Sequence, residues 1–274
     1  MDCKGDKVMG YQAVFKRYEL KYRITEEQKA KIMKAMEPYM EADRYGKSTI
    51  RNIYFDTDDY ILARHSIAKP DYKEKLRIRS YSRADADSTV FVELKRKYDH
   101  LVYKRRVGVT EKEAVDWICR GKSVGMHEDQ RSREIDYFLS LYDGIRPALY
   151  LSYDREAYRM KDGSDFRVTF DTNILCREHD LSLESDPYGT SILEDGMVLM
   201  ELKCSGGLPL WMVSILSKER IYKTSFSKYG TAYCSFMEET PAERAHEIAA
   251  ESPAAAFREA RAKKIQPSYG LAFG

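Results

Sequence analysis

The chain has 274 residues, of which 43% are hydrophobic and 33% are charged, so it can bury a sizeable core. Its 46 Lys and Arg residues against 44 Asp and Glu residues give a formal net charge of only +2, which argues against a general nucleic-acid coat protein. No apolar run is long enough to cross a bilayer and residues 1–7 lack the apolar core of a secretion signal, so we expect a cytoplasmic protein.

Strands separated by short turns or by helices are predicted along most of the chain. Runs bounded by turn or helix signals predict strands at residues 14–24, 49–56, 72–82, 88–98, 101–109, 148–159, 165–171 and 197–204. Apolar periodicity and capping residues predict helices after Thr25, near 58–64, from Thr110 to Gly121, at 130–142 and at 208–219. The short connections at 98–100 and 161–164 indicate antiparallel neighbours.

One domain accounts for the periodic part of the chain, because no low-complexity linker interrupts residues 11–236. We expect an α+β domain at residues 13–237, preceded by an N-terminal extension at 1–12. From about Glu238 the composition shifts to Ala, Glu, Arg and Lys with several prolines, so residues 238–274 are expected to form a mobile or helical tail. The five cysteines are widely scattered and indicate neither a disulfide framework nor a zinc site.

Charged side chains recur at every second residue inside several of these strands. The sets are Lys73, Lys75, Arg77, Arg79; Arg17, Glu19, Lys21; Glu93, Lys95, Lys97; and Glu201, Lys203. Because side chains alternate between the faces of a strand, each set lies on one face. On a single strand the simpler explanation is a solvated surface. Repetition on many strands, most of them basic, instead predicts a surface that holds a polyanion.

Eight antiparallel strands are enough to close a barrel, and closure removes exposed sheet edges. We therefore expect an eight-stranded antiparallel β-barrel with flanking helices and with the charged face inward. Uncompensated charges in a dry lumen would cost on the order of a few kcal/mol each, so anions, acids or water must accompany them. A phosphate chain suits this lumen, because Arg grips phosphate oxygens in pairs and Lys supplies a compact charge.

Acids placed two residues from a lysine are candidates for a metal site in this lumen. Hard divalent cations take oxygen ligands and keep waters and substrate phosphates in their shell, so one or two carboxylates suffice. We rank Glu201 first, Glu19 second and Glu93 third as ligands of Mn²⁺ or Mg²⁺. The alternative for each is a counter-ion for the neighbouring basic residues.

Several motifs, in their order and spacing, resemble one family. They are RYELKY at 17–22, IYFD at 53–56, KLRIR at 75–79, VELK at 92–95, YDREAY at 153–158, FRVTFD at 166–171, MELK at 200–203 and FSKYG at 226–230. In these motifs the chain resembles a bacterial member of the polyphosphate-polymerase (VTC) domains, within the triphosphate tunnel metalloenzyme (CYTH-like) superfamily.

The resemblance implies a tunnel whose basic residues clamp phosphates, namely Lys21, Arg77, Arg79, Lys95, Arg155, Arg167, Lys203 and Lys228. It also implies that Ser227 assists at the tunnel end and that Glu201 holds Mn²⁺ or Mg²⁺. The implied reaction transfers the terminal phosphoryl group of ATP onto polyphosphate, with ATP, triphosphate and polyphosphate as partners and no nucleic acid. Fungal members carry membrane helices in addition, so coupling of synthesis to translocation would need a membrane-protein partner.

Arg17 stands where hydrolysing or cyclising tunnel enzymes typically have the first acid of a Glu-x-Glu-x-Lys motif. We assign Arg17, with Ser227, to substrate binding, although it could equally pair with an acid such as Asp56. Loss of this carboxylate favours the polymerase over the cyclase and the two-metal hydrolase. Two alternatives stay open: a tripolyphosphatase or nucleoside triphosphatase, and a non-catalytic polyphosphate-binding module.

The many tyrosines interleaved with basic residues could stack bases, but packing in the barrel wall is the favoured interpretation. A base stacked at the tunnel mouth is an intermediate case for which the sequence selects no residue. We also expect Arg77→Ala or Arg79→Ala to abolish activity with little loss of stability, because removing like charge from a crowded lumen relieves repulsion.

Overall fold

The computed structural model describes residues 18–98, 101–122 and 129–236. Arg17, the predicted N-terminal extension and the predicted tail at 238–274 lie outside the described residues. The described part is an α+β fold, in which six helices accompany one large antiparallel sheet. None of these helices is long and apolar enough to cross a membrane.

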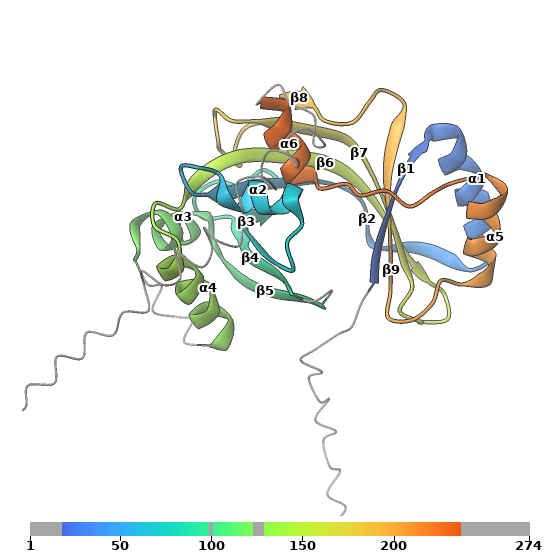
Figure 1. The fold of residues 1–274 in the computed structure, drawn as a ribbon, viewed down its shortest axis with the longest axis horizontal. Coiled ribbons are helices and arrows are strands. Elements are labelled where there is room, and N and C mark those ends of the chain that lie inside the picture. Colours follow the sequence, from blue (N-terminus) through green and yellow to red (C-terminus); the bar gives the residue numbers. More distant parts are fainter. Residues whose placement is uncertain (1–17, 99–100, 123–128, 237–274) are drawn as a thin grey trace, which may run out of the picture.

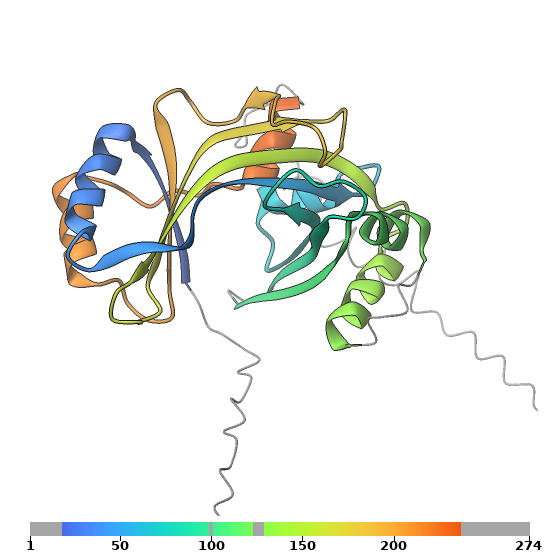
Figure 2. The same cartoon turned by 180° about the vertical axis from the view of Figure 1, so that it is seen from behind.

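One sheet contains all nine described strands. Its order is β1 (Tyr18–Thr25), β9 (Met197–Cys204), β7 (Arg167–Arg177), β6 (Arg146–Met160), β2 (Met40–Asp56), β3 (Tyr72–Ser80), β4 (Thr89–Tyr98) and β5 (Leu101–Thr110), with β8 (Thr190–Ser191) paired to β7 off this path. Figures 1 and 2 show that the sheet bends into an arch, with β1 and β5 at its two ends. The sheet therefore has a concave and a convex face.

The predicted closed barrel is wrong, because β1 and β5 do not pair with each other. One edge of β1 pairs with β9. Its other edge meets the segment before the last helix, where the Thr224 amide donates to the Lys21 carbonyl at 2.8 Å. That edge is therefore already engaged at Lys21, and the arch stays open between its end strands.

Six helices accompany the sheet in the described residues. They are α1 (Glu26–Met36), α2 (Ile61–Ala68), α3 (Glu111–Arg120), α4 (Gln130–Leu141), α5 (Leu210–Lys218) and α6 (Lys228–Phe236). Thr25 and Thr110 form capping boxes with Gln28 and Glu113, and Gly121 ends α3 at a φ of +63°. The capping signals predicted these starts correctly, whereas α6 was not predicted.

Helices cover the convex face at both ends of the arch (Figure 1). Residues of α1 and α5, such as Ile32 and Met212, share a core with Phe170 and Met200 of the sheet. At the other end, Trp117 of α3 and Phe138 of α4 pack with strand residues of β2 to β5. At the two ends of the arch, apolar side chains of the strands thus face these four helices, whereas alternating charged side chains such as Lys75 and Arg77 face the hollow.

Two strands are longer than predicted, and one helix and one short strand were missed. Strand β2 begins at Met40 rather than 49, because its first half contains a register shift between Ala42 and Lys47 that breaks the alternating pattern. Strand β7 continues to Arg177. The turn between β6 and β7 was predicted correctly and contains Gly163 at a φ of +77°.

Candidate functional site

The concave face carries a cluster of cations around one buried acid, Glu93 of β4. Its Oε2 atom accepts from Nε and Nη2 of Arg77, at 2.9 and 2.7 Å, and lies 3.6 Å from Arg79. Its Oε1 atom lies 2.6 Å from the Lys104 ammonium. Burial by itself would raise the pKa of Glu93, but the surrounding cations outweigh it and hold that pKa below its ordinary value. Glu93 is therefore an internal counter-ion.

A second cluster lies on β6, β7 and β9, around the buried acids Asp171 and Glu201. Arg155 donates to both Asp171 oxygens, at 2.6 and 2.7 Å, and lies 3.5 Å from Glu201. Lys228, the first residue of α6, reaches Asp171 at 2.6 Å and Glu201 at 3.2 Å. Lys203 lies 3.5 Å from Glu201. Each of the two acids thus has more than one cationic neighbour.

Tyr153 of β6 connects the two clusters. Its hydroxyl accepts from Nη2 of Arg79 at 2.9 Å, while Arg155 and Lys228 lie over its ring at 5.0 and 4.7 Å from the centroid. Burial alone would raise the pKa of Tyr153, but Arg79, Arg155 and Lys228 more than offset this effect and lower it. Residues from distant parts of the sequence therefore share one electrostatic environment.

Side chains bridge the open side of the arch. Lys95 of β4 contacts Glu19 of β1 at 3.0 Å, and this ammonium is the main reason why the pKa of Glu19 is lowered to about 2. Lys21 lies 3.9 Å from Glu19 and 3.6 Å from Glu201, and it donates to the Phe226 carbonyl at 2.8 Å. The segment before α6 and these ion pairs together line the hollow where a closed barrel would have strand pairing.

Lys75 of β3 forms no ion pair with a carboxylate among the described residues, unlike Arg77 and Arg79 of the same strand. Its ammonium donates to the Ser227 hydroxyl at 2.9 Å. Burial, together with the positive charges of Lys21 and Lys95, holds the pKa of Lys75 well below its ordinary value. A half-buried lysine among other lysines lacks an anion, which a phosphate oxygen would supply.

The structure brings most predicted site residues to the concave face. The contacts above include Lys21, Arg77, Arg79, Lys95, Arg155, Lys203, Lys228, Ser227, Glu19 and Glu201. Arg167 pairs in register with Lys203 and so shares that face, but its side chain is exposed. Arg17 lies outside the described residues.

Sequence reasoning missed Lys104, Asp171 and Tyr153 as members of the site. Lys104 and Arg106 alternate on β5 like the basic residues of β3, and this signal was available in the sequence. Asp171 ends the motif at 166–171, but its pairing with Arg155 depends on the register of β6 and β7. No local pattern marks Tyr153 as a connection between clusters.

The acids fit a divalent cation in part. Glu19 and Glu201 both face the Lys21 ammonium, so two hard oxygen donors already share one cationic neighbour. No cluster of three or more His, Cys, Asp or Glu side chains suited to a metal occurs in the described ranges. Substrate phosphates and water would therefore have to complete the coordination shell, as is usual for Mg²⁺.

A family model described as the VTC domain matches residues 16–237. The chain belongs to the VTC domain family. This membership confirms the resemblance drawn from the sequence motifs, which lie between residues 17 and 230. A comparison with curated proteins finds no significant match for this VTC domain.

The solved structures that match this VTC domain have low sequence identity to it. A candidate adenylate cyclase from Bacillus halodurans has 16% identity and a TM-score of 0.47, over 76% of this chain and 92% of that chain. A candidate adenylyl cyclase from Hippeastrum, HpAC1, described as having a dominant triphosphatase activity, also has 16% identity and a TM-score of 0.47, over 79% and 95%. At these scores the likeness supports no statement about activity.

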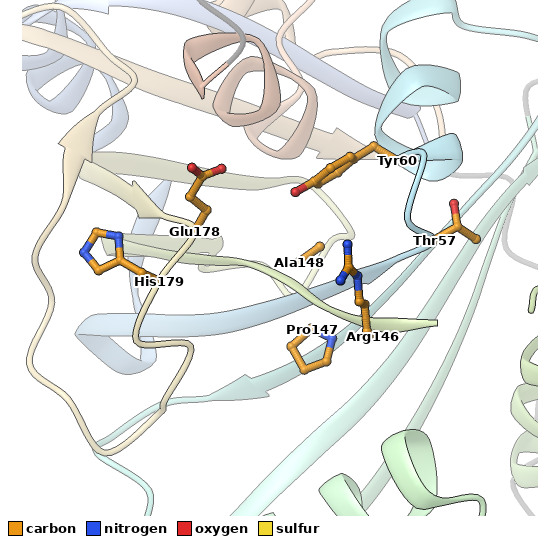
Figure 3. Close-up of a pocket in the computed structure, with 7 residues that line it drawn as sticks. All are labelled: Thr57, Tyr60, Arg146, Pro147, Ala148, Glu178 and His179. Carbon is orange, nitrogen blue, oxygen red and sulfur yellow. The ribbon is translucent and has the colours of Figure 1, made fainter. Parts of the chain in front are cut away.

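A separate cavity of about 400 Å³ lies away from the basic clusters. Its lining comes from the turn before α2, the start of β6 and the residues just after β7: Thr57, Tyr60, Arg146, Pro147, Ala148, Glu178 and His179. Figure 3 shows Tyr60 and Glu178 directed toward the same space. No residue predicted from the sequence to bind phosphate or metal lines it.

Proposed function

We propose that this VTC domain is a metal-dependent phosphotransferase that makes inorganic polyphosphate from the terminal phosphate of ATP on its concave face. The observation that carries the proposal is the position of Lys75, whose nitrogen has a hydroxyl but no carboxylate partner among the described residues and lies beside other lysines, so a bound phosphate oxygen would favour its charged form. The concave face also holds more cations than carboxylates, so a polyanion is the ligand that it suits best.

The proposed phosphoryl transfer forms one bond and breaks one. A terminal oxygen of the growing chain attacks the γ-phosphorus of ATP, the bond between that phosphorus and the β,γ-bridging oxygen breaks, and ADP leaves. Such a reaction needs alignment and charge neutralisation rather than covalent catalysis. Arg77 and Arg79 would hold phosphate oxygens through planar donor groups, while Lys75 and Lys104 would add compact charges.

The second cluster would hold the other phosphate groups in line. Arg155 and Lys228 are fixed by the buried Asp171, so their charged ends are pre-positioned at little further entropic cost. Ser227 lies beside Lys75 and could donate its hydroxyl to a phosphate oxygen. Arg167, at the exposed end of β7, would guide the chain outside the hollow.

Glu201 and Glu19 would hold Mn²⁺ or Mg²⁺. When bound, such a cation supplies neutralisation of negative charge on the phosphate oxygens. The two carboxylates themselves are kept ionised by the neighbouring lysines, because the pKa of each is lowered, so they are available as oxygen donors at neutral pH.

Incubation of the purified protein with ATP and Mn²⁺ tests the proposal. Chains that lengthen with time on a polyacrylamide gel, with one ADP formed for each phosphate added, are the expected result. Release of inorganic phosphate without chains would instead establish a hydrolase on the same cations. Tight binding of polyphosphate with no turnover under any divalent metal would establish a binding module.

A further inference from the structure

The concave face ends beyond Arg79 in a group of aromatic rings. Phe91 pairs with Arg79 across β3 and β4 and therefore shares its face. The Tyr81 ring meets Phe91 edge-on, with centroids 5.8 Å apart. Tyr45 lies nearly parallel to Tyr81, at an interplanar angle of 12° and a centroid distance of 6.3 Å. The hollow thus passes from a basic lining to an aromatic one.

Arg106 links these rings to the Glu93 cluster. Its guanidinium lies 3.6 Å from the Phe91 centroid and 5.3 Å from the Tyr81 centroid, and Nη2 donates to the Tyr81 hydroxyl at 3.1 Å. Its Nε atom lies 3.5 Å from Oε1 of Glu93, the acid that also pairs with Arg77. Arg106 alone therefore separates the rings from Glu93 and from the cations around it that would hold phosphates.

An irregularity in β2 places Tyr45 beside Tyr81. The register of β2 shifts between Ala42 and Lys47, and a Cβ at Gly46 would be strained, because its φ is +56°. Oδ1 of Asp43 accepts from the Tyr45 and Gly46 amides at 2.9 and 3.1 Å. Irregularities of this kind re-aim a side chain, often next to a functional site.

Tyr45 does not pack in the hydrophobic core, because 61% of the residue is exposed. The Arg44 guanidinium lies over the ring at 4.6 Å and donates to the Tyr45 hydroxyl. An exposed aromatic ring flanked by arginines next to a phosphate-binding surface is the arrangement on which bases stack.

We propose that Tyr45 and Tyr81 form the platform on which the adenine base of the ATP donor stacks. This inference rests on the proposed function, because it assigns the base of the same substrate whose phosphates lie against Arg77 and Lys104. Every base has an aromatic face, so stacking alone predicts that other purine nucleotides, such as GTP, are accepted as well.

Calorimetric titration of the full chain with ATP and with inorganic tripolyphosphate, both without divalent metal, tests the platform. Tyr45→Ala should weaken ATP binding about five-fold or more, which is the lower range for loss of one stacked base. The same variant should leave tripolyphosphate binding unchanged, because tripolyphosphate has no base. Tyr45→Phe keeps the ring and should keep the ATP affinity.

Tyr137→Ala is the matched control, because Tyr137 is a comparably exposed tyrosine, at 58%, on α4 at the convex side. It should change neither affinity. If Tyr45→Ala alters both affinities equally, or neither, the platform is ruled out while the proposed function stands. If the unaltered protein binds neither ATP nor tripolyphosphate, with or without Mn²⁺, the proposed function fails and the platform fails with it.

Discussion

Arg77 and Glu93 face each other across β3 and β4, and two nitrogens of the guanidinium donate to the same carboxylate oxygen at 2.9 and 2.7 Å. Glu93 is almost fully buried and also faces Arg79 and Lys104. This single carboxylate therefore neutralises several cations. The hollow therefore contains a network of ion pairs with an excess of positive charge, rather than a surface of like charges alone.

Glu93→Gln should lower the free energy of unfolding by about 3 kcal/mol, because it leaves buried cations without their counter-ion. Tripolyphosphate should restore more stability to this variant than to the parent protein, since an added anion takes over the same role. Urea unfolding with and without tripolyphosphate measures both effects.

Glu134→Gln provides the control for that experiment. Glu134 lies on α4 and pairs with Arg96 of β4 and Arg105 of β5, on the convex side of the sheet. Its loss should also destabilise the protein, but tripolyphosphate should give this variant no extra protection. Equal protection of the two variants would contradict the assignment of the anion site to the concave face.

The same contact corrects the expectation that Arg77→Ala would cost little stability. That expectation assumed a lumen of like charges, whereas Arg77 is paired with Glu93 and donates to the Tyr54 hydroxyl at 2.8 Å. Removal of Arg77 therefore breaks a partly buried ion pair as well as relieving repulsion. Loss of activity remains the prediction, but a measurable loss of stability should accompany it.

Proton uptake should accompany ATP binding in mildly alkaline solution. Burial lowers the pKa of Lys73 and of Lys104 to about 8, so both are partly neutral at pH 8.5. A bound anion favours the charged form and raises these pKa values, so protons are taken up from the buffer. At pH 6.5 both lysines are already charged, and uptake by them disappears.

Calorimetry at pH 8.5 in two buffers of different ionisation enthalpy measures this uptake, with ATP and without metal. Lys104→Met should bind ATP with a smaller uptake than the parent protein. Binding heats that are independent of the buffer at pH 8.5 would show that the phosphates do not approach these lysines.

Arg155→Ala and Arg167→Ala should separate an internal clamp from an exposed guide. Arg155 is paired with the fully buried Asp171, so its loss should destabilise the fold by about 3 kcal/mol and abolish turnover. Arg167 is exposed, so its loss should change stability by less than about 0.5 kcal/mol and weaken polyphosphate binding. Thermal unfolding and polyphosphate titration compare the two; a strongly destabilised Arg167→Ala variant would contradict the exposed position.

Glu19→Gln should raise the Mn²⁺ concentration needed for half-maximal turnover of ATP. The change removes one of the two carboxylates that face Lys21, while the amide keeps the shape of the side chain. Binding of metal-free tripolyphosphate should be retained or become tighter, because a negative charge has left the hollow. An unchanged Mn²⁺ dependence would remove Glu19 from the metal site.

The period-two pattern predicted much of the concave face. Lys75, Arg77 and Arg79 lie on one face because strand geometry fixes their alternation, and the sequence displays that alternation directly. The ion pairs were not predictable, because the contact between Lys95 and Glu19 joins the two ends of a sheet whose curvature no local pattern specifies.

The open end of the sheet and the position of Tyr45 were missed for related reasons. The number of strands permits a barrel, but the pairing of Lys21 with Thr224 decides what the β1 edge meets, and Thr224 lies in a segment with no strand signal. Tyr45 lies within the irregular part of β2, where alternation is lost. Irregular segments thus placed two features that periodicity could not reveal.

A crystal structure of the protein with a non-hydrolysable triphosphate and Mn²⁺ tests most directly whether the concave face binds phosphate. We predict phosphate oxygens within hydrogen-bonding distance of Lys75, Arg77 and Lys104, with the Lys75 ammonium turned from Ser227 toward the ligand. A triphosphate bound elsewhere, with Lys75 still paired only to the Ser227 hydroxyl, would contradict this account.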